Sequence, residues 1–149
     1  MKFIVNSTCL LKEIQKLSSV ISSNNTLPIL DNFLFELTGN HMTIIASDLE
    51  VTMIAAIDVE SETDGRITIP AKILTDTLKT FSNQPLTFLI DTNNFSIEMS
   101  SEIGNYRLAG QNADEFPKTP ILSGSSATSF SSEILANAIN KTLFASGND

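Results

Sequence analysis

The sequence has few of the residues on which catalytic and metal sites usually depend. Its 149 residues include one cysteine, Cys9, and one histidine, His41. One cysteine cannot form a disulfide bond within the chain, and one histidine nearly excludes a histidine-based catalytic triad or a zinc site, which needs several histidine or cysteine ligands. A Gly-rich phosphate loop is also absent. We therefore expect no metal, no cofactor and no catalytic residue, with His41 a solvated turn residue and Cys9 a partly buried helix residue.

Long apolar runs and an excess of basic charge are missing too. The longest apolar runs have four to six residues, such as Met53–Ile57, whereas a bilayer-spanning helix needs about 20. The first residues lack the apolar core of a signal peptide, which predicts a cytoplasmic protein with no membrane partner. Nine basic and seventeen acidic residues give a formal charge of −8. Taken for the whole chain, this charge argues against a nucleic-acid-binding protein.

Hydrophobic periodicity predicts the same order of elements twice, βαβββ followed by βαβββ. Phe33–Leu37 and Leu86–Ile90 are 53 residues apart, as are Met42–Ala46 and Phe95–Met99. The expected elements are strand Phe3–Val5, helix Thr8–Ser22 with Ser7 as its N-cap, strands Phe33–Leu37, Met42–Ala46 and Val51–Val59, a polar loop Glu60–Gly65, strand Ile67–Ile69, helix Ala71–Ser82, and strands Pro85–Asp91, Phe95–Ser100 and Tyr106–Gly110.

The last part of the chain resembles its beginning. Two prolines and the Ser123–Ser126 segment predict a linker. A strand at Ala127–Phe130 and a helix at Ser131–Ala145 then follow, matching the N-terminal strand and helix at an offset of 124 residues. We therefore expect one domain at residues 1–122 and, at 123–149, a linker with the first strand and helix of a second, truncated copy.

The charge is divided unevenly among these elements. The three expected helices carry five lysines and three carboxylates, a net charge of +2, whereas four basic and fourteen acidic residues elsewhere give −10. Lys12 and Lys16 are four residues apart, and Lys72 and Lys79 are seven apart, so each pair shares one helix face. Such faces are either ordinary solvated surfaces or sites of loose, salt-sensitive contact with phosphates.

Two other functions remain open at this point. Asp48 and Glu50 lie between two expected strands, where they would serve an acidic metal-binding or hydrolytic domain, or where Asp48 simply caps a turn. The exposed edges of β-strands would instead suit a protein-binding module.

Several short segments stand in a recognisable order along essentially the whole chain. They are Met1-Lys2-Phe3, Leu10-Leu11-Lys12, Thr26-Leu27-Pro28-Ile29-Leu30, Ser47-Asp48-Leu49-Glu50, Ile69-Pro70-Ala71 and Ala113-Asp114-Glu115-Phe116-Pro117. Together these segments resemble one family, the bacterial sliding clamps, which are the beta subunits of DNA polymerase III.

The resemblance implies an α+β DNA clamp fold, in which each domain has two βαβββ halves with antiparallel sheets outside and two helices on the inner face. It implies a homodimeric ring that encircles duplex DNA, slides without reading sequence and tethers the replicative polymerase, without being an enzyme. It also implies that the DNA polymerase III catalytic subunit and the clamp loader bind through domains absent from this chain.

The resemblance also implies roles for individual residues. Lys72 falls where relatives have a basic DNA-contacting residue, and Asn24 falls where some relatives have an arginine that touches DNA. Lys12, Lys16 and Lys79 are expected to contribute from their helix faces alone. The half of the ring interface within this chain is expected near Ile73, Tyr106 and Leu108.

Overall fold

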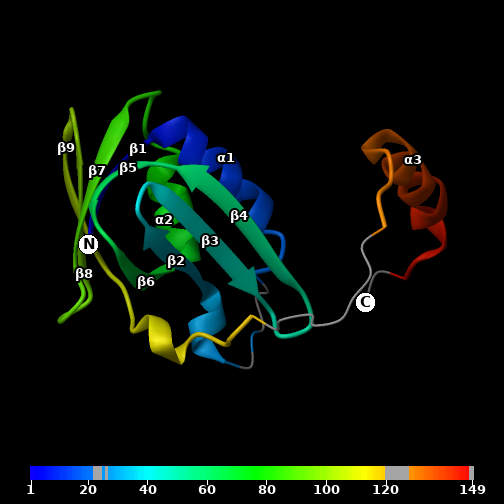
Figure 1. Ribbon diagram of the computed structural model, residues 1–149, viewed down its shortest axis with the longest axis horizontal. Helices are drawn as coiled ribbons and strands as arrows, with labels where there is room; N and C mark the ends of the chain where they lie inside the picture. Colours follow the sequence, from blue (N-terminus) through cyan, green and yellow to red (C-terminus); the bar gives the residue numbers. More distant parts are fainter. Residues whose placement is uncertain (22–24, 26, 120–127, 148–149) are drawn as a thin grey trace. The chain divides into compact units, whose positions relative to one another are not determined.

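A computed structural model describes residues 1–21, 25, 27–119 and 128–147 (Figure 1). By its contacts the chain divides into two compact units, Met1–Thr119 and Pro120–Asp149. The described part of the first unit contains two antiparallel sheets and two α-helices, which confirms the α+β class. Among the described residues, no helix is long and apolar enough to cross a membrane.

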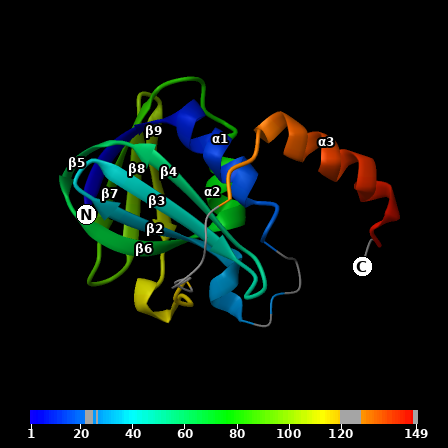
Figure 2. The same cartoon turned by 45° about the vertical axis from the view of Figure 1, so that its right-hand side comes forward.

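The first unit is built from a five-stranded sheet and a four-stranded sheet. The strand order is β5-β1-β7-β8-β9 in the first and β4-β3-β2-β6 in the second (Figures 1 and 2). The strands are β1 (Lys2–Asn6), β2 (Asn32–Thr38), β3 (His41–Ser47), β4 (Thr52–Asp58), β5 (Glu60–Thr63), β6 (Gly65–Pro70), β7 (Pro85–Asp91), β8 (Ser96–Ser101) and β9 (Gly104–Ala109).

The two sequence repeats exchange their first strands. β1 belongs to the first repeat but pairs with β7 of the second, where the rings of Phe3 and Phe88 stack with centroids 4.7 Å apart. β6 belongs to the second repeat but pairs with β2 of the first, with Phe33 opposite Ile69. Each sheet therefore contains strands of both repeats, so neither repeat forms a sheet of its own.

Both helices pack against the sheets and against each other. They are α1 (Ser7–Leu17) and α2 (Ala71–Leu78), which lie side by side in both views (Figures 1 and 2). One hydrophobic core joins the helices to strands of both sheets. Its largest fully buried side chains include Phe3, Phe33, Phe35, Phe88, Leu10, Ile14, Leu17, Met42, Ile44 and Ile67. Burial of this continuous apolar surface is the main stabilising term for the unit.

Helix α1 begins and ends earlier than the sequence predicts. Its N-cap is Asn6, whose side chain accepts hydrogen bonds from the backbone N–H groups of Thr8 and Cys9. Ser7, the expected cap, is buried, and its hydroxyl donates instead to the carbonyl of Ser82 at 2.7 Å.

The last turns of both predicted helices unwind. Helix α1 ends at Leu17 rather than Ser22, and the Ser18 hydroxyl there donates to the carbonyl of Ile14. Helix α2 ends at Leu78 rather than Ser82, and the Thr80 hydroxyl donates to the carbonyl of Thr77. The backbone N–H groups of Ser18 and Thr80 donate to the same two carbonyls, so the hydroxyls add to the closing turns.

The strands differ from the prediction at two places. The expected loop at Glu60–Gly65 is largely the edge strand β5, which pairs only with β1 and whose residues are exposed except for the half-buried Ser61. Phe95, expected to begin a strand, lies in the turn before β8 with φ of +60°. The β7–β8 turn is therefore two residues longer than the Gly39-Asn40 turn between β2 and β3, because the strand ends pair as Asp91 with Ser96 rather than Thr38 with His41.

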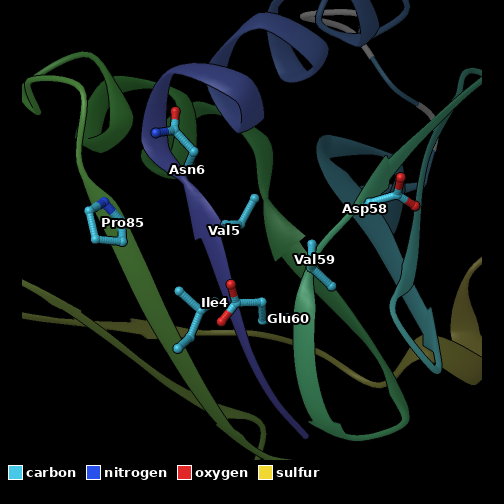
Figure 3. A pocket seen from close by; sticks show the side chains of 7 residues that line it. All are labelled: Ile4, Val5, Asn6, Asp58, Val59, Glu60 and Pro85. Atoms are coloured by element: carbon cyan, nitrogen blue, oxygen red, sulfur yellow. The ribbon is translucent and has the colours of Figure 1, made fainter.

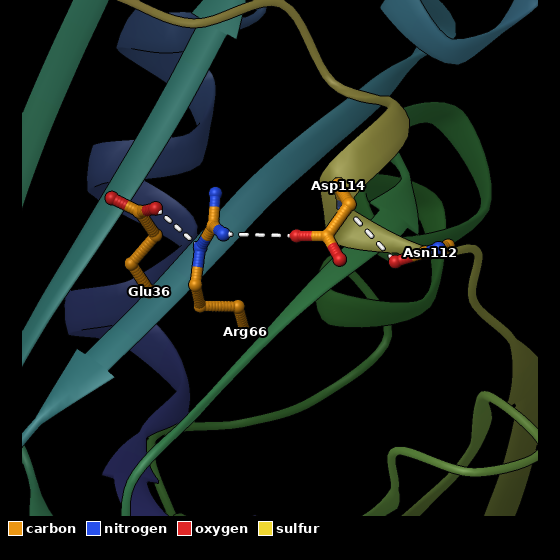
Figure 4. A network of polar contacts seen from close by, with 4 residues as sticks. All are labelled: Glu36, Arg66, Asn112 and Asp114. Atoms are coloured by element: carbon orange, nitrogen blue, oxygen red, sulfur yellow. Dashed lines mark hydrogen bonds and ion pairs between the residues drawn. The ribbon is translucent and has the colours of Figure 1, made fainter.

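The segment after β9 crosses to the other sheet and is fixed there. Gln111 pairs with Thr68 of β6, and the short 3-10 helix η2 (Ala113–Glu115) follows. Arg66 binds Glu36 at 2.7 Å and Asp114 at 3.2 Å (Figure 4). Beneath this network, a small second apolar cluster forms around 3-10 helix η1 (Pro28–Asp31). Its members are Ile29, Leu30, Leu34, Ile45, Ala113 and Phe116.

The second unit contains α3 (Ser132–Thr142) and the 3-10 helix η3 (Leu143–Ala145), close to the predicted helix. The predicted strand is wrong for residues 128–130, which form no strand, and Ala127 lies outside the described residues. Every described residue of this unit is exposed, because no strand packs against it there. The exposed apolar side chains are Phe130, Ile134, Leu135, Ile139, Leu143 and Phe144.

Candidate nucleic-acid interface

Helix α1 presents two lysines on the surface opposite its buried stripe. Leu10, Ile14 and Leu17 are buried in the core. Lys12 and Lys16 are exposed, and their four-residue spacing places them one turn apart on the same face. The sequence prediction of a shared lysine face on this helix agrees with that placement.

Helix α2 repeats the arrangement with one difference. Leu74 and Leu78 are buried, and Lys72 is exposed in the first turn. Lys79 is the C-cap residue rather than part of the helix, a place where the helix dipole favours a cation. A shallow depression separates this face from the end of α1, and its lining residues are Ser18, Ile21, Ala71, Lys72, Thr75, Asp76 and Lys79.

Two of the four lysines are held by carboxylates three residues before them. Lys16 Nζ lies 2.7 and 2.8 Å from the two carboxylate oxygens of Glu13. Lys79 Nζ lies 3.2 Å from Oδ1 of Asp76. Across the described residues, neither Lys12 nor Lys72 has an ion pair. Both carboxylates are among the three counted in the helices of the sequence, and their spacing from the lysines, at which helical side chains meet, is the signal that predicts these pairs.

Asn24, the remaining residue expected to contact DNA, lies outside the described residues. The described residues after it are Asn25 and then the chain from Leu27 onward, where η1 follows. Any role for Asn24 therefore stays a prediction.

The residues expected at a ring interface lie on α2 and β9. Tyr106 and Leu108 are half-buried on β9, the outer strand of the five-stranded sheet. The Tyr106 ring meets that of Phe81, just after α2, edge to face with centroids 5.1 Å apart. Ile73 of α2 is 53% exposed. The described surface thus carries half-exposed apolar groups beside a strand edge with no partner strand.

The loop containing Asp48 and Glu50 is a hydrogen-bonded turn. One carboxylate oxygen of Asp48 accepts from the backbone N–H groups of Glu50 at 2.9 Å and Val51 at 2.6 Å. Asp48 therefore caps the turn, the plainer of the two sequence interpretations. Among the described residues, no group of three or more histidine, cysteine, aspartate or glutamate side chains lies close enough to hold a metal ion.

The single histidine and the single cysteine both lie at the surface. Nδ1 of His41 lies 2.7 Å from Oδ1 of Asp58, and both side chains are more than 80% exposed, which confirms the placement of His41 in solvent. Cys9 is exposed rather than partly buried, because it lies outside the apolar stripe of α1.

A separate hollow lies where the chain passes from β4 to β5 (Figure 3). Its floor includes the buried Val5 and Val59, and its rim includes Asp58 and Glu60. The rim is acidic, so the potential there opposes phosphate binding. A nucleic-acid surface is therefore favoured at the helices and not at this hollow.

Comparison with known proteins relates the chain to one protein family. Residues 1–120 match the family described as DNA polymerase III beta subunit, N-terminal domain. The chain is 28% identical over 156 residues to the beta sliding clamp of Synechocystis, and 29% identical over 150 residues to that of Vibrio cholerae. These matches cover 100% and 99% of this chain but 40% of each relative, so the chain spans about two fifths of the length of the curated relatives it matches.

Solved structures show the same fold. The DNA polymerase III subunit beta of Pseudomonas aeruginosa matches with a TM-score of 0.91 and 26% identity, over 100% of this chain and 41% of that one. The sliding clamp of Bacillus subtilis matches in fold with a TM-score of 0.93 at 23% identity, again over 100% and 41% of the two chains. With residues 1–120 matched and the fold shared, the chain belongs to the DNA polymerase III beta subunit family and carries that family's N-terminal domain.

Proposed function

We propose that this chain is the N-terminal part of a processivity clamp, a non-catalytic ring that encircles duplex DNA and tethers the replicative polymerase. The function of such a ring is to raise the effective concentration of the polymerase at the template. Residues 123–149 begin a second copy of the domain. Duplex DNA is the partner of the helices, and the DNA polymerase III catalytic subunit and clamp loader bind domains outside this chain. The ring works in the cytoplasm, as a homodimer.

The separation of charge within the first unit carries the proposal. Residues 7–17 and 71–79 hold four lysines and two carboxylates. The rest of Met1–Thr119 holds four basic and thirteen acidic residues. A protein with a formal charge of −8 can hold a phosphate backbone when its exposed lysines share one side, and its acidic remainder then repels DNA from the other surfaces.

Loose contact suits a sliding ring. Lysine ammonium groups meet phosphates as point charges and read no base sequence. Contacts of this kind break and re-form at each step along the duplex. We therefore expect weak, sequence-independent binding that salt abolishes.

The test is an NMR titration of the isotope-labelled chain with a short duplex at low salt. We expect shifts of amides in α1 and α2, none in β8 and β9, and no change when the duplex sequence is scrambled. Lys12→Ala and Lys72→Ala should each weaken binding, and a fourfold rise in salt should weaken it strongly. Shifts confined to the sheets, or binding unaffected by both alanine variants, would contradict the proposal.

The ring interface is proposed at α2 and β9. The edge of β9 and the half-exposed Tyr106 and Leu108 suit docking of a partner subunit's strand and apolar side chains. In a longer form that contains all the domain copies, Ile73→Glu should convert the dimer to monomers in analytical ultracentrifugation. Ile73 is 53% exposed here, so the same variant should leave the unfolding of this chain unchanged. A dimer that persists would exclude Ile73 from the interface.

A further inference from the structure

We propose that Glu13 and Asp76 lower the affinity of this domain for DNA, each by neutralising the second lysine on its helix face. This inference rests on the proposed function and concerns how strongly the helices hold DNA. The two helices share one pattern: a lysine that forms no ion pair with any described residue comes first, and a lysine held by a carboxylate three residues before it comes second.

The Glu13 contact is the tighter of the two. Both carboxylate oxygens lie within 2.8 Å of Lys16 Nζ. The Glu13 side chain is 19% exposed, whereas that of Asp76 is 59% exposed. A less exposed pair is screened less by water and salt. Glu13 should therefore restrain Lys16 more than Asp76 restrains Lys79.

An ammonium group in such a pair is a poor phosphate ligand. To reach a phosphate, Lys16 or Lys79 must leave its carboxylate, or the phosphate must approach an uncompensated negative charge within a few ångströms. Either route offsets part of the gain from one phosphate contact, because a surface ion pair of this kind contributes a small stabilisation that must be given up. The domain thus holds DNA chiefly with Lys12 and Lys72, although the same faces carry four lysines.

The restraint has a physical use in a ring that moves. Each neutralised phosphate adds about 0.9 to the steepness with which affinity falls with salt. Two effective contacts per domain instead of four leave less binding energy to be broken at each step of sliding. The carboxylates thus keep the affinity of the domain for DNA low enough for the ring to slide.

The experiment measures the salt dependence of duplex binding by the 149-residue chain. Glu13→Gln, Asp76→Asn and the double variant are compared with the unsubstituted chain by NMR titration at several salt concentrations. Each single change should steepen the slope of log K against log salt by up to about one. Over a fourfold rise in salt, the unsubstituted chain loses affinity by a certain factor. That factor should be about 3.5-fold larger for Glu13→Gln, and larger by less than this for Asp76→Asn.

Glu98→Gln is the matched control. Glu98 forms a 3.3 Å ion pair with Arg107 between β8 and β9, away from the helices. The change alters net charge by the same amount as Glu13→Gln. It should leave the slope unchanged, and an equal gain for Glu98→Gln would overturn the inference by assigning the effect to net charge alone.

The alanine variants separate the two proposals. If Lys12→Ala and Lys72→Ala flatten the slope while Glu13→Gln and Asp76→Asn leave it unchanged, the restraint is wrong and the DNA-facing role of the helices stands. If none of these four variants changes the slope, the proposed function is itself contradicted. Steeper slopes for Glu13→Gln and Asp76→Asn, with an unchanged slope for Glu98→Gln, would support both proposals.

Discussion

Helices α1 and α3 carry similar sequence patterns in opposite surroundings. Leu10 of α1 is fully buried, whereas Ile134, its counterpart 124 residues later, is 67% exposed. Both helices have eleven residues and an apolar stripe. Helix α1 has strands to pack against, and α3 has none among the described residues. Amphipathic spacing therefore specifies which face is to be buried, while the stability of the helix depends on a partner surface.

The largest expected contrast is in hydrogen exchange. Amides of Leu10 and Ile14 should open only with global unfolding, which costs about 5–15 kcal/mol for a typical domain. Amides of Ile139 should exchange with opening energies below about 1 kcal/mol, because an isolated helix of this length is marginal in water. Native-state exchange by NMR measures both. Equal protection in α3 would mean that its apolar face is covered in solution.

Truncation of one core side chain should reveal the same difference. Leu10→Ala should lower the free energy of unfolding by about 2–5 kcal/mol, because it leaves a cavity in the core. Ile134→Ala should change it by less than about 0.5 kcal/mol, as is usual for exposed side chains. Urea denaturation followed by circular dichroism gives both values. A comparable loss of stability for Ile134→Ala would contradict the expected difference between the buried face of α1 and the exposed face of α3.

The N-caps provide a smaller contrast. Asn6 accepts two backbone hydrogen bonds, so Asn6→Ala should cost about 1 kcal/mol of stability. The side chain of Ser131 makes no capping hydrogen bond. Ser131→Ala should accordingly be neutral in the same denaturation measurement, and a loss equal to that of Asn6→Ala would show that α3 is capped in solution.

The smallest effect concerns the helix-surface ion pairs. Glu13→Gln should cost about 0.2–0.5 kcal/mol, the usual contribution of such a pair on a helix. Glu133 and Lys141 of α3 are eight residues apart, beyond the spacing of facing side chains, so Glu133→Gln removes no pair between them. Glu133 lies in the first turn of α3, where its charge favours that helix alone, so the change should leave the unfolding of the first unit unaltered. Thermal unfolding of the two variants side by side checks this. A cost above 1 kcal/mol for Glu13→Gln would indicate a structural role beyond the pair with Lys16.

Much of the fold could be predicted because its helices and central strands have strong apolar periodicity. Strand β5 could not, because Glu60, Ser61 and Glu62 are polar and only pairing with β1 makes them a strand. Asn6 and Ser7 are equally good capping residues in sequence. The choice between them depends on the loop at Ser82, which takes the Ser7 hydroxyl.

The exchange of β1 and β6 between sheets was equally beyond the sequence. A short apolar strand carries no local signal of which strand it pairs with, so the repeat alone did not say how the strands are divided between the sheets. The candidate interface was more accessible, because helical spacing placed each pair of lysines on one face. The spacing of Glu13 and Asp76 from their lysines is visible in the sequence, but the distance of each contact and the exposure of each carboxylate required the positions of side-chain atoms.

The position of β1 also bears on synthesis of the protein. The Met1 and Ile90 backbones bond to each other at 2.9 and 3.0 Å across 89 residues of sequence. During translation the first strand therefore emerges long before β7, the neighbour that encloses it. At about 5–20 residues per second, that wait lasts roughly 4–18 seconds. Throughout this interval the apolar Phe3 and Val5 lack their final cover, so chaperone contact in the cell should fall on strand β1.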